Sequence, residues 1–148
     1  MTILQNSTVV LHGEAAMEAA GGEFARQLIE AGELAGAVIT LSGELGAGKT
    51  TFCRGLLRAC GHDGLVKSPT YTLLEDYRTP VGYFCHLDLY RLNDPDELEF
   101  IGFRDLLENS TTVLVEWPER VPDLAGISAV SINIQHRDAE SRVLEIKV

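Results

Sequence analysis

Residues 43–50 read Gly-Glu-Leu-Gly-Ala-Gly-Lys-Thr, the G-x-x-x-x-G-K-T pattern of a phosphate-binding loop, or P-loop. Its glycines let the backbone fold closely around a di- or triphosphate and point successive N–H groups at it. A helix that begins at the loop adds the positive end of its dipole. In this pattern Lys49 reaches the β- and γ-phosphates and the Thr50 hydroxyl binds Mg²⁺. The other loop residues expected to contact the nucleotide are Glu44, Gly46, Ala47, Gly48 and Thr51.

Two acids follow apolar runs in the way that a magnesium site requires. Mg²⁺ takes one or two carboxylates together with waters and phosphate oxygens. Glu116 follows the apolar run 113–115, and Asp88 follows the run 83–87. We expect both in the site, one at the metal and the other orienting the attacking water, and the sequence leaves the assignment of these roles open. The alternative for each is a carboxylate that only faces water where its strand ends.

Several further side chains near these motifs have more than one interpretation. Thr70 follows a proline after the P-loop helix, where a hydroxyl can sense the γ-phosphate and order its loop; an ordinary turn threonine is the alternative. Trp117 is interpreted first as a core residue, with a nucleotide neighbour or a partner anchor as alternatives. The histidines lack metal-ligand spacing and are interpreted as surface or hydrogen-bonded polar residues: His12, His62, His86 and His136.

The elements around the loop match the context that a P-loop needs, with a strand before it and a helix after it. Residues 37–41 are a short apolar run that predicts a buried strand, and residues 50–60 carry apolar side chains at helical spacing up to Gly61. A helix over 14–31 comes before them, and two adjacent glycines, Gly21 and Gly22, weaken it by about 1 kcal/mol each relative to alanine.

The remaining chain mixes strand–helix units with hairpins. The pattern predicts, in order, a loop over 61–70, strands over 71–77 and 83–90 joined by turn residues 78–82, a helix start at 94–97, a break between two short helices at Gly102, and strands over 111–115, 129–135 and 142–148, the last two joined by a polar loop over 136–141. This order predicts an α/β, P-loop NTPase-like three-layer fold with a mixed parallel and antiparallel central sheet, in one domain over residues 1–148.

Composition narrows the function classes. The chain has 148 residues, and 45% of them are hydrophobic, which suits one globular domain with a substantial core. No apolar run approaches about 20 residues and no signal-peptide pattern is present, so we expect no membrane span and a cytoplasmic location. Its three cysteines form no C-x-x-C pair, which favours reduced, buried thiols. The net charge of −10 disfavours direct binding to nucleic acid, whose phosphates need a basic surface.

Taken together, five segments closely resemble the bacterial TsaE (YjeE) family, the ATPase of tRNA threonylcarbamoyladenosine biosynthesis. The resemblance covers about residues 35–120 and is looser in the N-terminal helix and the C-terminal hairpin. The segments that carry it, in order, are 43–51, 67–73, 86–92, 94–99 and 115–119.

The resemblance implies binding of ATP or ADP with Mg²⁺, slow ATP hydrolysis, and action on a TsaB–TsaD complex that modifies adenosine 37 of tRNA, so that tRNA is reached only indirectly. It implies that Lys49 binds phosphate and that Thr50 and Glu116 are the magnesium ligands. Thr70 matches a switch-like loop, and Asp88 matches an acid important for activity. Glu14 and the C-terminal hairpin lie where the family closes over the adenine.

Other nucleotide-dependent functions fit the P-loop alone. A small-molecule kinase needs an acceptor pocket and an arginine-bearing lid, neither of which the sequence indicates. A GTPase switch needs an N-K-x-D motif, which does not occur. A nucleotide-bound adaptor without turnover is the remaining alternative. No arginine is an evident finger for the transition state, and Arg91 is the only candidate we name.

Overall fold

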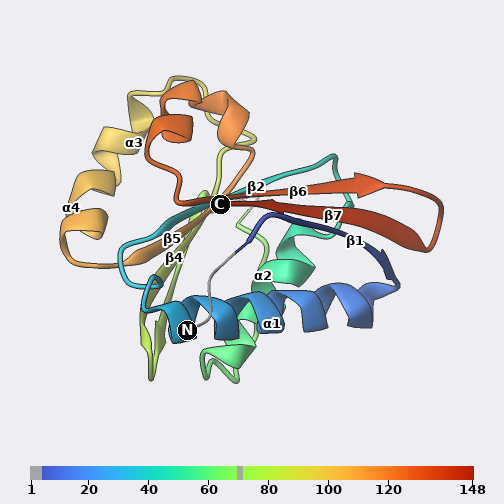
Figure 1. The fold of residues 1–148 in the computed structure, drawn as a ribbon. Helices are drawn as coiled ribbons and strands as arrows, with labels where there is room; N and C mark the ends of the chain where they lie inside the picture. Colours follow the sequence, from blue (N-terminus) through green and yellow to red (C-terminus); the bar gives the residue numbers. More distant parts are fainter. Residues whose placement is uncertain (1–4, 70–71) are drawn as a thin grey trace.

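The computed structural model describes residues 5–69 and 72–148, which form a mixed sheet with helices on both faces (Figure 1). The strands are β1 (Ser7–His12), β2 (Val38–Ser42), β3 (Leu74–Thr79), β4 (Gly82–Asp88), β5 (Thr112–Glu116), β6 (Val130–His136) and β7 (Ser141–Lys147). The helices are α1 (Glu14–Ala31), α2 (Lys49–Ala59), α3 (Glu97–Phe100), α4 (Phe103–Glu108) and two 3₁₀ helices, η1 (Pro118–Arg120) and η2 (Pro122–Gly126).

The sheet is parallel in its centre and antiparallel towards both edges. Its seven strands run in the order β1-β7-β6-β2-β5-β4-β3. β2 pairs in parallel with both β5 and β6, and β4 pairs in parallel with β5. The register places Leu41 and Asp88 opposite Glu116, on the two sides of β5. The carboxyl ends of β2, β4 and β5 therefore meet at one edge of the sheet, which is where parallel α/β folds bind ligands.

The two faces of the sheet bury separate apolar clusters. Successive strand residues point to opposite faces, so Ile39 and Leu41 join the cluster under α1 and α2, whereas Val38 joins the cluster under the other helices. In Figure 1, α1 and α2 lie below the sheet, and α3, α4 and the two 3₁₀ helices lie above it. The predicted three-layer α/β fold with a mixed sheet is confirmed.

Helices α1 and α2 approach each other closely at two glycines. A Cβ added to Gly55 would lie 1.8 Å from the carbonyl oxygen of Glu18, and one added to Gly21 would lie 2.0 Å from that of Phe52. No side chain fits at either position, because backbone blocks both. Gly21, one of the two glycines that weaken helix 14–31 locally, therefore permits its tertiary contact with α2, and α1 runs unbroken as predicted.

Most helices and strands begin and end within one to three residues of the predicted positions. β3 begins at Leu74 among the described residues, later than the predicted start at Tyr71, which lies outside them. β4 ends at Asp88 rather than at residue 90, because the Tyr90 N–H donates to Asp88 Oδ1 at 2.9 Å and turns the chain away from the sheet. Gly102, with φ of 74°, separates α3 from α4 as predicted.

The sequence analysis missed three elements. Strand β1 pairs with β7 although most of its residues are exposed, so it carries no apolar alternation that would reveal a strand. The short helices η1 and η2 follow β5, each beginning at a proline. The three cysteines are free and buried, as predicted. None of the helices in the described residues is long and apolar enough to cross a bilayer.

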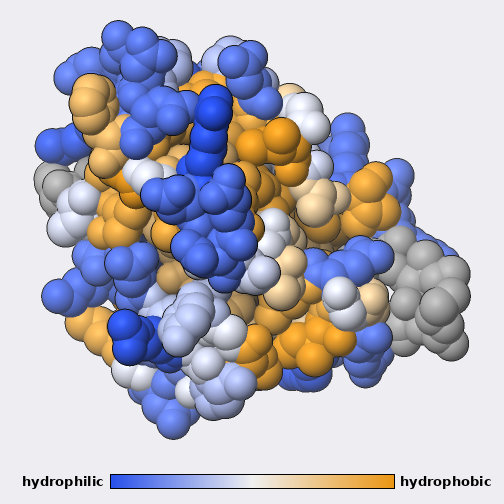
Figure 2. All heavy atoms as spheres, turned by 90° about the vertical axis from the view of Figure 1, so that its left-hand side faces the viewer, coloured by the Kyte–Doolittle hydropathy of each residue, from blue (hydrophilic) through white to orange (hydrophobic). Residues whose placement is uncertain are grey.

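Figure 2 shows the end of the molecule at the left of Figure 1, where hydrophilic and hydrophobic residues are interspersed over the surface. The helical layer here divides its apolar residues between the interior and solvent. Leu98 and Phe103 are buried in the second cluster, whereas Phe100 is 88% exposed. No residue of α3 or α4 lines the phosphate cavity or the hairpin cavity described below.

Candidate functional site

The P-loop connects the carboxyl end of β2 to the N-terminus of α2, which begins at Lys49. Two glycines show why the loop needs this residue type. A Cβ on Gly43 would lie 2.6 Å from the Ile134 carbonyl oxygen on neighbouring β6. Gly48 caps α2 with φ of 115°, a conformation that side chains disfavour. The loop therefore presses against β6 and enters α2 through a left-handed residue, and glycine suits both positions.

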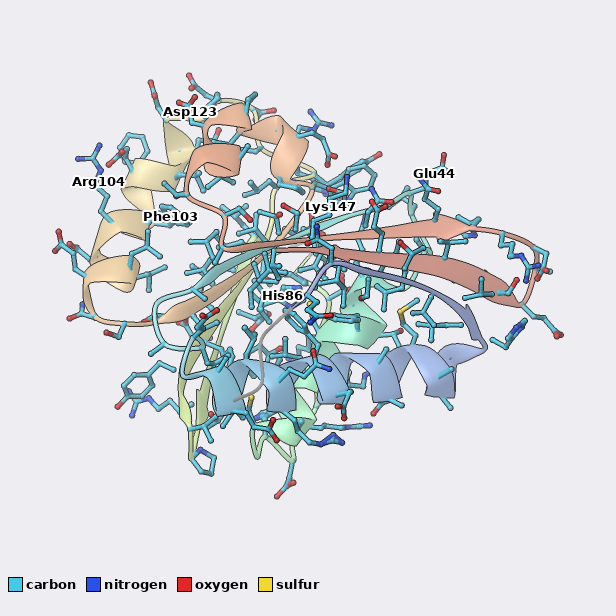
Figure 3. All side chains as sticks on the ribbon, in the orientation of Figure 1. Glu44, His86, Phe103, Arg104, Asp123 and Lys147 are labelled. Atoms are coloured by element: carbon cyan, nitrogen blue, oxygen red, sulfur yellow. The ribbon has the colours of Figure 1, made fainter. Side chains whose placement is uncertain are left out.

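A cavity of about 260 Å³ lies above the P-loop, and we call it the phosphate cavity. Most of the predicted site residues meet in its wall. Thr70 lies outside the described residues, and Glu44 borders a neighbouring cavity instead, with its side chain exposed (Figure 3). The lining residues are Leu45, Gly46, Ala47, Gly48, Lys49, Thr50, Thr51, Ser68, Asp88, Glu116 and Trp117.

The two predicted magnesium ligands are neighbours in this cavity. The Thr50 hydroxyl donates a hydrogen bond to Glu116 Oε2 at 3.1 Å. Glu116 is only 3% exposed at the end of β5. Asp88, 4% exposed, lies across the strand pair from it. A hydroxyl beside buried carboxylates is a hard oxygen donor set, and it fits a Mg²⁺ ion that keeps several waters and phosphate oxygens.

Lys49 is the cation of the phosphate cavity. Its ammonium group donates to the Gly43 carbonyl oxygen and lies 3.7 Å from the centroid of the Trp117 ring. Burial lowers the pKa of Lys49, and the charges of Glu116, Asp88 and Glu119 oppose that shift. The charge is held between a carbonyl, an aromatic face and carboxylates, within the same cavity as the loop amides.

Trp117 is a wall of the phosphate cavity as well as a packing residue, so its interpretation as core is incomplete. It is half-buried against the second apolar cluster and has φ of 59°, in the left-handed region. This conformation costs a residue with a side chain roughly 1–2 kcal/mol. It turns the chain directly after Glu116 and leaves the indole ring facing Lys49.

His86 is a site neighbour that the sequence analysis did not single out. It is fully buried on β4, and its Nε2 lies 2.6 Å from Glu116 Oε2. Figure 3 shows it in the interior, close to the sheet and α2. The spacing of the histidines along the sequence does not point to a metal site. The alternation of β4 does place His86 near the site, because residues 86 and 88 share one face of the strand.

Cys53 completes a buried group with these two residues. One ligand atom from each of Cys53, His86 and Glu116 lies within 4.8 Å of the others. Burial raises the pKa of the Cys53 thiol well above its usual value, and the charge of Glu116 adds to the shift. The thiol is therefore protonated near neutral pH and does not act as a free thiolate.

A second cavity, of about 680 Å³, adjoins the P-loop on its other side, and we call it the hairpin cavity. It shares Gly46, Ala47, Gly48 and Thr51 with the phosphate cavity. The rest of its wall comes from the start of α1 and from the β6–β7 hairpin: His12, Gly13, Glu14, Met17, Ala139, Glu140 and Arg142. Of these the sequence analysis named His12, as a surface or hydrogen-bonded polar residue, and Glu14, and the family resemblance placed the C-terminal hairpin beside Glu14. The side chain of Glu14 pairs with Arg54 at 3.1 Å.

Arg142 ties the hairpin cavity to the P-loop. Its Nε donates to the Ala47 carbonyl oxygen at 3.2 Å, and its Nη2 lies 3.5 Å from that of Gly46. The Gly13 N–H closes the opposite side by donating to the Glu140 carbonyl oxygen at 2.8 Å. No local pattern in the sequence indicates these contacts, since they join segments more than 90 residues apart.

A P-loop between a parallel strand and a helix, with acids at the ends of the neighbouring strands, defines the P-loop NTPase-like class of proteins. A family model described as "Threonylcarbamoyl adenosine biosynthesis protein TsaE" matches residues 11–144. The chain belongs to the TsaE family, which acts in the biosynthesis of threonylcarbamoyladenosine in tRNA. The family resemblance read from the motifs is confirmed.

Individual relatives agree with the family match. The tRNA threonylcarbamoyladenosine biosynthesis protein TsaE of Haemophilus influenzae is 39% identical over 143 residues, which span 97% of this chain and 90% of that protein. The protein of the same name from Bacillus subtilis is 35% identical over 107 residues, 72% of this chain and 66% of that protein. The crystal structure of Bacillus subtilis YdiB superposes with a TM-score of 0.69 at 23% identity, covering 99% of this chain and 87% of that one, and supports the fold.

Proposed function

We propose that this protein binds ATP and ADP together with Mg²⁺ and hydrolyses ATP slowly, in support of the N6-threonylcarbamoyl modification of tRNA adenosine 37. The observation that carries the proposal is the meeting of Lys49, the Thr50–Glu116 pair and the P-loop amides in one cavity. Membership of the TsaE family supplies the biosynthetic context.

The phosphate groups would bind to the loop amides and to the N-terminus of α2, where the helix dipole favours negative charge. Lys49 would exchange its contacts with the Gly43 carbonyl and the Trp117 ring for the β- and γ-phosphate oxygens. In this scheme Glu44 contributes its main chain, since its carbonyl oxygen closes the loop by accepting from the Ala47 N–H at 3.1 Å.

Thr50 and Glu116 would hold Mg²⁺, and the bound ion would neutralise charge on the phosphates. Asp88 then has the role of orienting the attacking water, because its carboxylate is held beside Glu116 and the Tyr90 N–H fixes one of its oxygens. Thr70 remains our proposed sensor of the γ-phosphate on sequence grounds.

The hairpin cavity is the proposed binding place of the nucleoside. It shares the P-loop with the phosphate cavity, and its volume of about 680 Å³ falls within the usual range for small-molecule pockets. Glu14 at the start of α1 would border the adenine, as the family resemblance suggests. This arrangement would place the phosphates and the base on the two sides of the loop.

Slow turnover and a protein partner are parts of the same proposal. Among the described residues that line the phosphate cavity, Lys49 is the cation, and Arg91 is an exposed residue of the turn after β4. An arginine finger changes the rate of phosphoryl transfer by about 10³–10⁵, so a site without one is expected to be slow.

We propose a TsaB–TsaD-like complex as the partner of this protein, with tRNA contacted only indirectly through that complex. We also propose a cytoplasmic location and a single domain over residues 1–148.

Calorimetry and phosphate release test this function together. We expect heat on titration of MgADP and slow release of phosphate from MgATP, with a changed rate when TsaB and TsaD are added. A protein that folds and binds neither MgADP nor MgATP refutes the proposal. Phosphate transferred to an added nucleoside instead of water indicates a kinase, and tighter binding of GDP than of ADP indicates a GTPase.

The Glu116→Ala variant tests the metal site. We expect turnover to fall about 100-fold or more, because several kcal/mol of charge stabilisation by the ion are lost. Initial rates of phosphate release over a Mg²⁺ titration measure the effect. Asp123→Ala is the matched control, since this exposed acid follows on η2 and lies outside the phosphate cavity. Normal hydrolysis by Glu116→Ala would show that the ligand assignment is wrong.

A further inference from the structure

The contact between His86 and Glu116 has no place in the scheme above. We propose that His86 is a positioning residue that fixes the metal-binding carboxylate of Glu116, and this inference rests on the proposed magnesium site. His86 would not touch nucleotide or metal. It would act by holding one carboxylate oxygen in place while the other groups of the cavity change partners.

Because both residues are buried, the contact with His86 replaces water as a hydrogen-bond donor to the Glu116 carboxylate. His86 is 0% exposed and Glu116 is 3% exposed, so water does not solvate the pair. An ionised carboxylate accepts hydrogen bonds only, so the 2.6 Å separation from Glu116 Oε2 requires the proton on His86 Nε2. A buried charge needs such a partner, because desolvation without one is costly.

Thr50 and His86 share the same acceptor atom, and this separates their roles. The Thr50 hydroxyl donates to Glu116 Oε2 at 3.1 Å, from α2, and His86 donates to it from β4. A hydroxyl that binds Mg²⁺ through a lone pair can still donate its proton to this oxygen, but its position is then set by the ion, whereas His86 would not contact the ion. His86 is then the donor that keeps the carboxylate aimed at the cavity, as the outer partners of metal ligands commonly do.

The surroundings of His86 give no structural reason for an imidazole at this position. Phe84, two residues earlier on the same face of β4, is an apolar member of the core cluster. The other ring nitrogen of His86, Nδ1, is buried without a hydrogen-bond partner among the described residues. An unmet buried polar atom destabilises the folded state, so an apolar side chain would suit packing better. The bond to Glu116 is the interaction that distinguishes histidine here.

The neighbouring thiol does not alter this interpretation. Cys53 lies close enough to join His86 and Glu116 in a soft-metal site. However, Glu116 Oε2 already accepts from Thr50 as well as from His86, and its partner hydroxyl is a hard ligand. We therefore assign Glu116 as a ligand of a hard metal ion and His86 as the residue that positions it. A direct test for a thiolate-bound ion is part of the experiment.

The experiment measures how strongly metal and nucleotide binding are coupled. Calorimetry gives the Kd of ADP with Mg²⁺ and with EDTA, and the ratio of the two values is the coupling. Electron paramagnetic resonance of Mn²⁺ in the presence of ADP reports metal occupancy directly. We compare wild type with His86→Leu, with His86→Gln, whose amide can donate to the same oxygen, and with Phe84→Leu as a packing control on the same strand face.

We expect His86→Leu to weaken metal binding about 10–100-fold while leaving the Kd of ADP in EDTA unchanged. His86→Gln should recover most of this loss. Phe84→Leu should lower the unfolding temperature and leave the coupling intact. This control separates a loss of stability from a loss of metal coupling, because a purely structural role of His86 would predict the same behaviour for both variants. If His86→Leu does not fold, the comparison of His86→Gln with the shorter His86→Asn replaces it, with recovery expected only for glutamine.

Three results would overturn the inference. His86→Leu with wild-type coupling removes the role of His86 and leaves the proposed function intact. A folded wild-type protein whose ADP affinity does not respond to Mg²⁺ refutes the proposed metal site itself, and the inference with it. A sulfur-to-Co²⁺ charge-transfer band in wild type that disappears in Cys53→Ser would make the three residues ligands of a soft ion instead.

Discussion

The phosphate cavity and the hairpin cavity share the P-loop but are built in different ways. The phosphate cavity is about 260 Å³ and is lined by the loop and the carboxyl ends of parallel strands, with Lys49, Asp88 and Glu116 each at most 5% exposed. The hairpin cavity is about 680 Å³ and is framed by an exposed hairpin and the start of a helix. One holds buried charges in a fixed register, whereas the other is assembled from segments at the edge of the fold.

The difference indicates how the two cavities would share the work of binding. The buried ammonium of Lys49 would attract a phosphate chain strongly in this low-dielectric cavity, and the carboxylates of Asp88 and Glu116 would do so only through the Mg²⁺ ion that we propose between them and the phosphates. The hairpin cavity depends on a few contacts between separate segments, such as those of Arg142 with the loop carbonyls. We therefore expect the phosphate cavity to supply most of the affinity and the hairpin cavity to supply a smaller, adjustable part.

Lys49→Ala is the strongest test of this division. Removing the buried cation should weaken nucleotide binding and lower turnover by about 10²–10³-fold or more, as loss of one preorganised charge partner does. Calorimetry with MgADP and phosphate release with MgATP give the two values. Lys147→Ala, at an exposed position on β7, is the matched control. Wild-type affinity in Lys49→Ala would mean that the hairpin cavity dominates binding.

Gly55→Ala tests whether the hairpin cavity needs the close contact of α1 with α2. The new Cβ meets the Glu18 carbonyl, so we expect a loss of about 1–3 kcal/mol in the free energy of unfolding and weaker ADP binding as the start of α1 shifts. Urea denaturation measures the first effect. Gly22→Ala is the control, because its Cβ would lie 3.5 Å from its nearest neighbour and should add up to about 1 kcal/mol of stability. A neutral Gly55→Ala would contradict the packing argument.

Arg142→Gln removes the charged link between the two cavities. We expect ADP binding to weaken about fivefold, equivalent to ~1 kcal/mol for half-buried hydrogen bonds to carbonyl oxygens. Calorimetry in EDTA isolates this effect from the metal. Arg137→Gln, at an exposed position in the same hairpin, should bind like wild type. A loss of 100-fold would place Arg142 among the principal contacts and reverse the ranking of the two cavities.

Glu14→Gln should have the smallest effect. The side chain of Glu14 is 71% exposed, and its ion pair with Arg54 is worth at most about 1 kcal/mol at such a surface. The amide keeps the shape and the hydrogen-bonding reach of the carboxylate. We expect less than a threefold change in the Kd of ADP by calorimetry and a small change in unfolding temperature. A tenfold loss would show that Glu14 contacts the base directly through its charge.

The phosphate cavity could be predicted from the sequence for two reasons. The P-loop is a local motif, and the carboxyl ends of parallel strands lie at the same edge of a sheet. The P-loop is contiguous, and the acids follow apolar runs that form parallel, buried strands. Glu116 and Asp88 meet because parallel strands bring their carboxyl ends to the same edge. The spacing of the histidines carries no signal for His86, whereas the alternation along β4 places it on the same face as Asp88.

The hairpin cavity could be predicted only in part: the family resemblance points to Glu14 and the C-terminal hairpin, whereas β1 and the contacts of Arg142 have no local signal in the sequence. β1 has exposed residues on both faces and pairs with β7 residues that lie 129 to 139 positions later, so no local pattern encodes the contact. In the sequence Arg142 is an ordinary polar residue of an alternating strand. Only the strand order of the folded sheet brings it into contact with the P-loop. Trp117 was interpreted as core since an indole after a buried strand usually is, and its left-handed backbone is visible only in the structure.

The stacking of Lys49 on Trp117 has a practical consequence, because the chain contains one tryptophan. Its fluorescence comes from a single indole whose π face lies against the Lys49 ammonium group. Any anion that draws the ammonium away changes the electric field on that chromophore. The protein thus contains an intrinsic optical reporter of phosphate occupancy, readable in real time without a label.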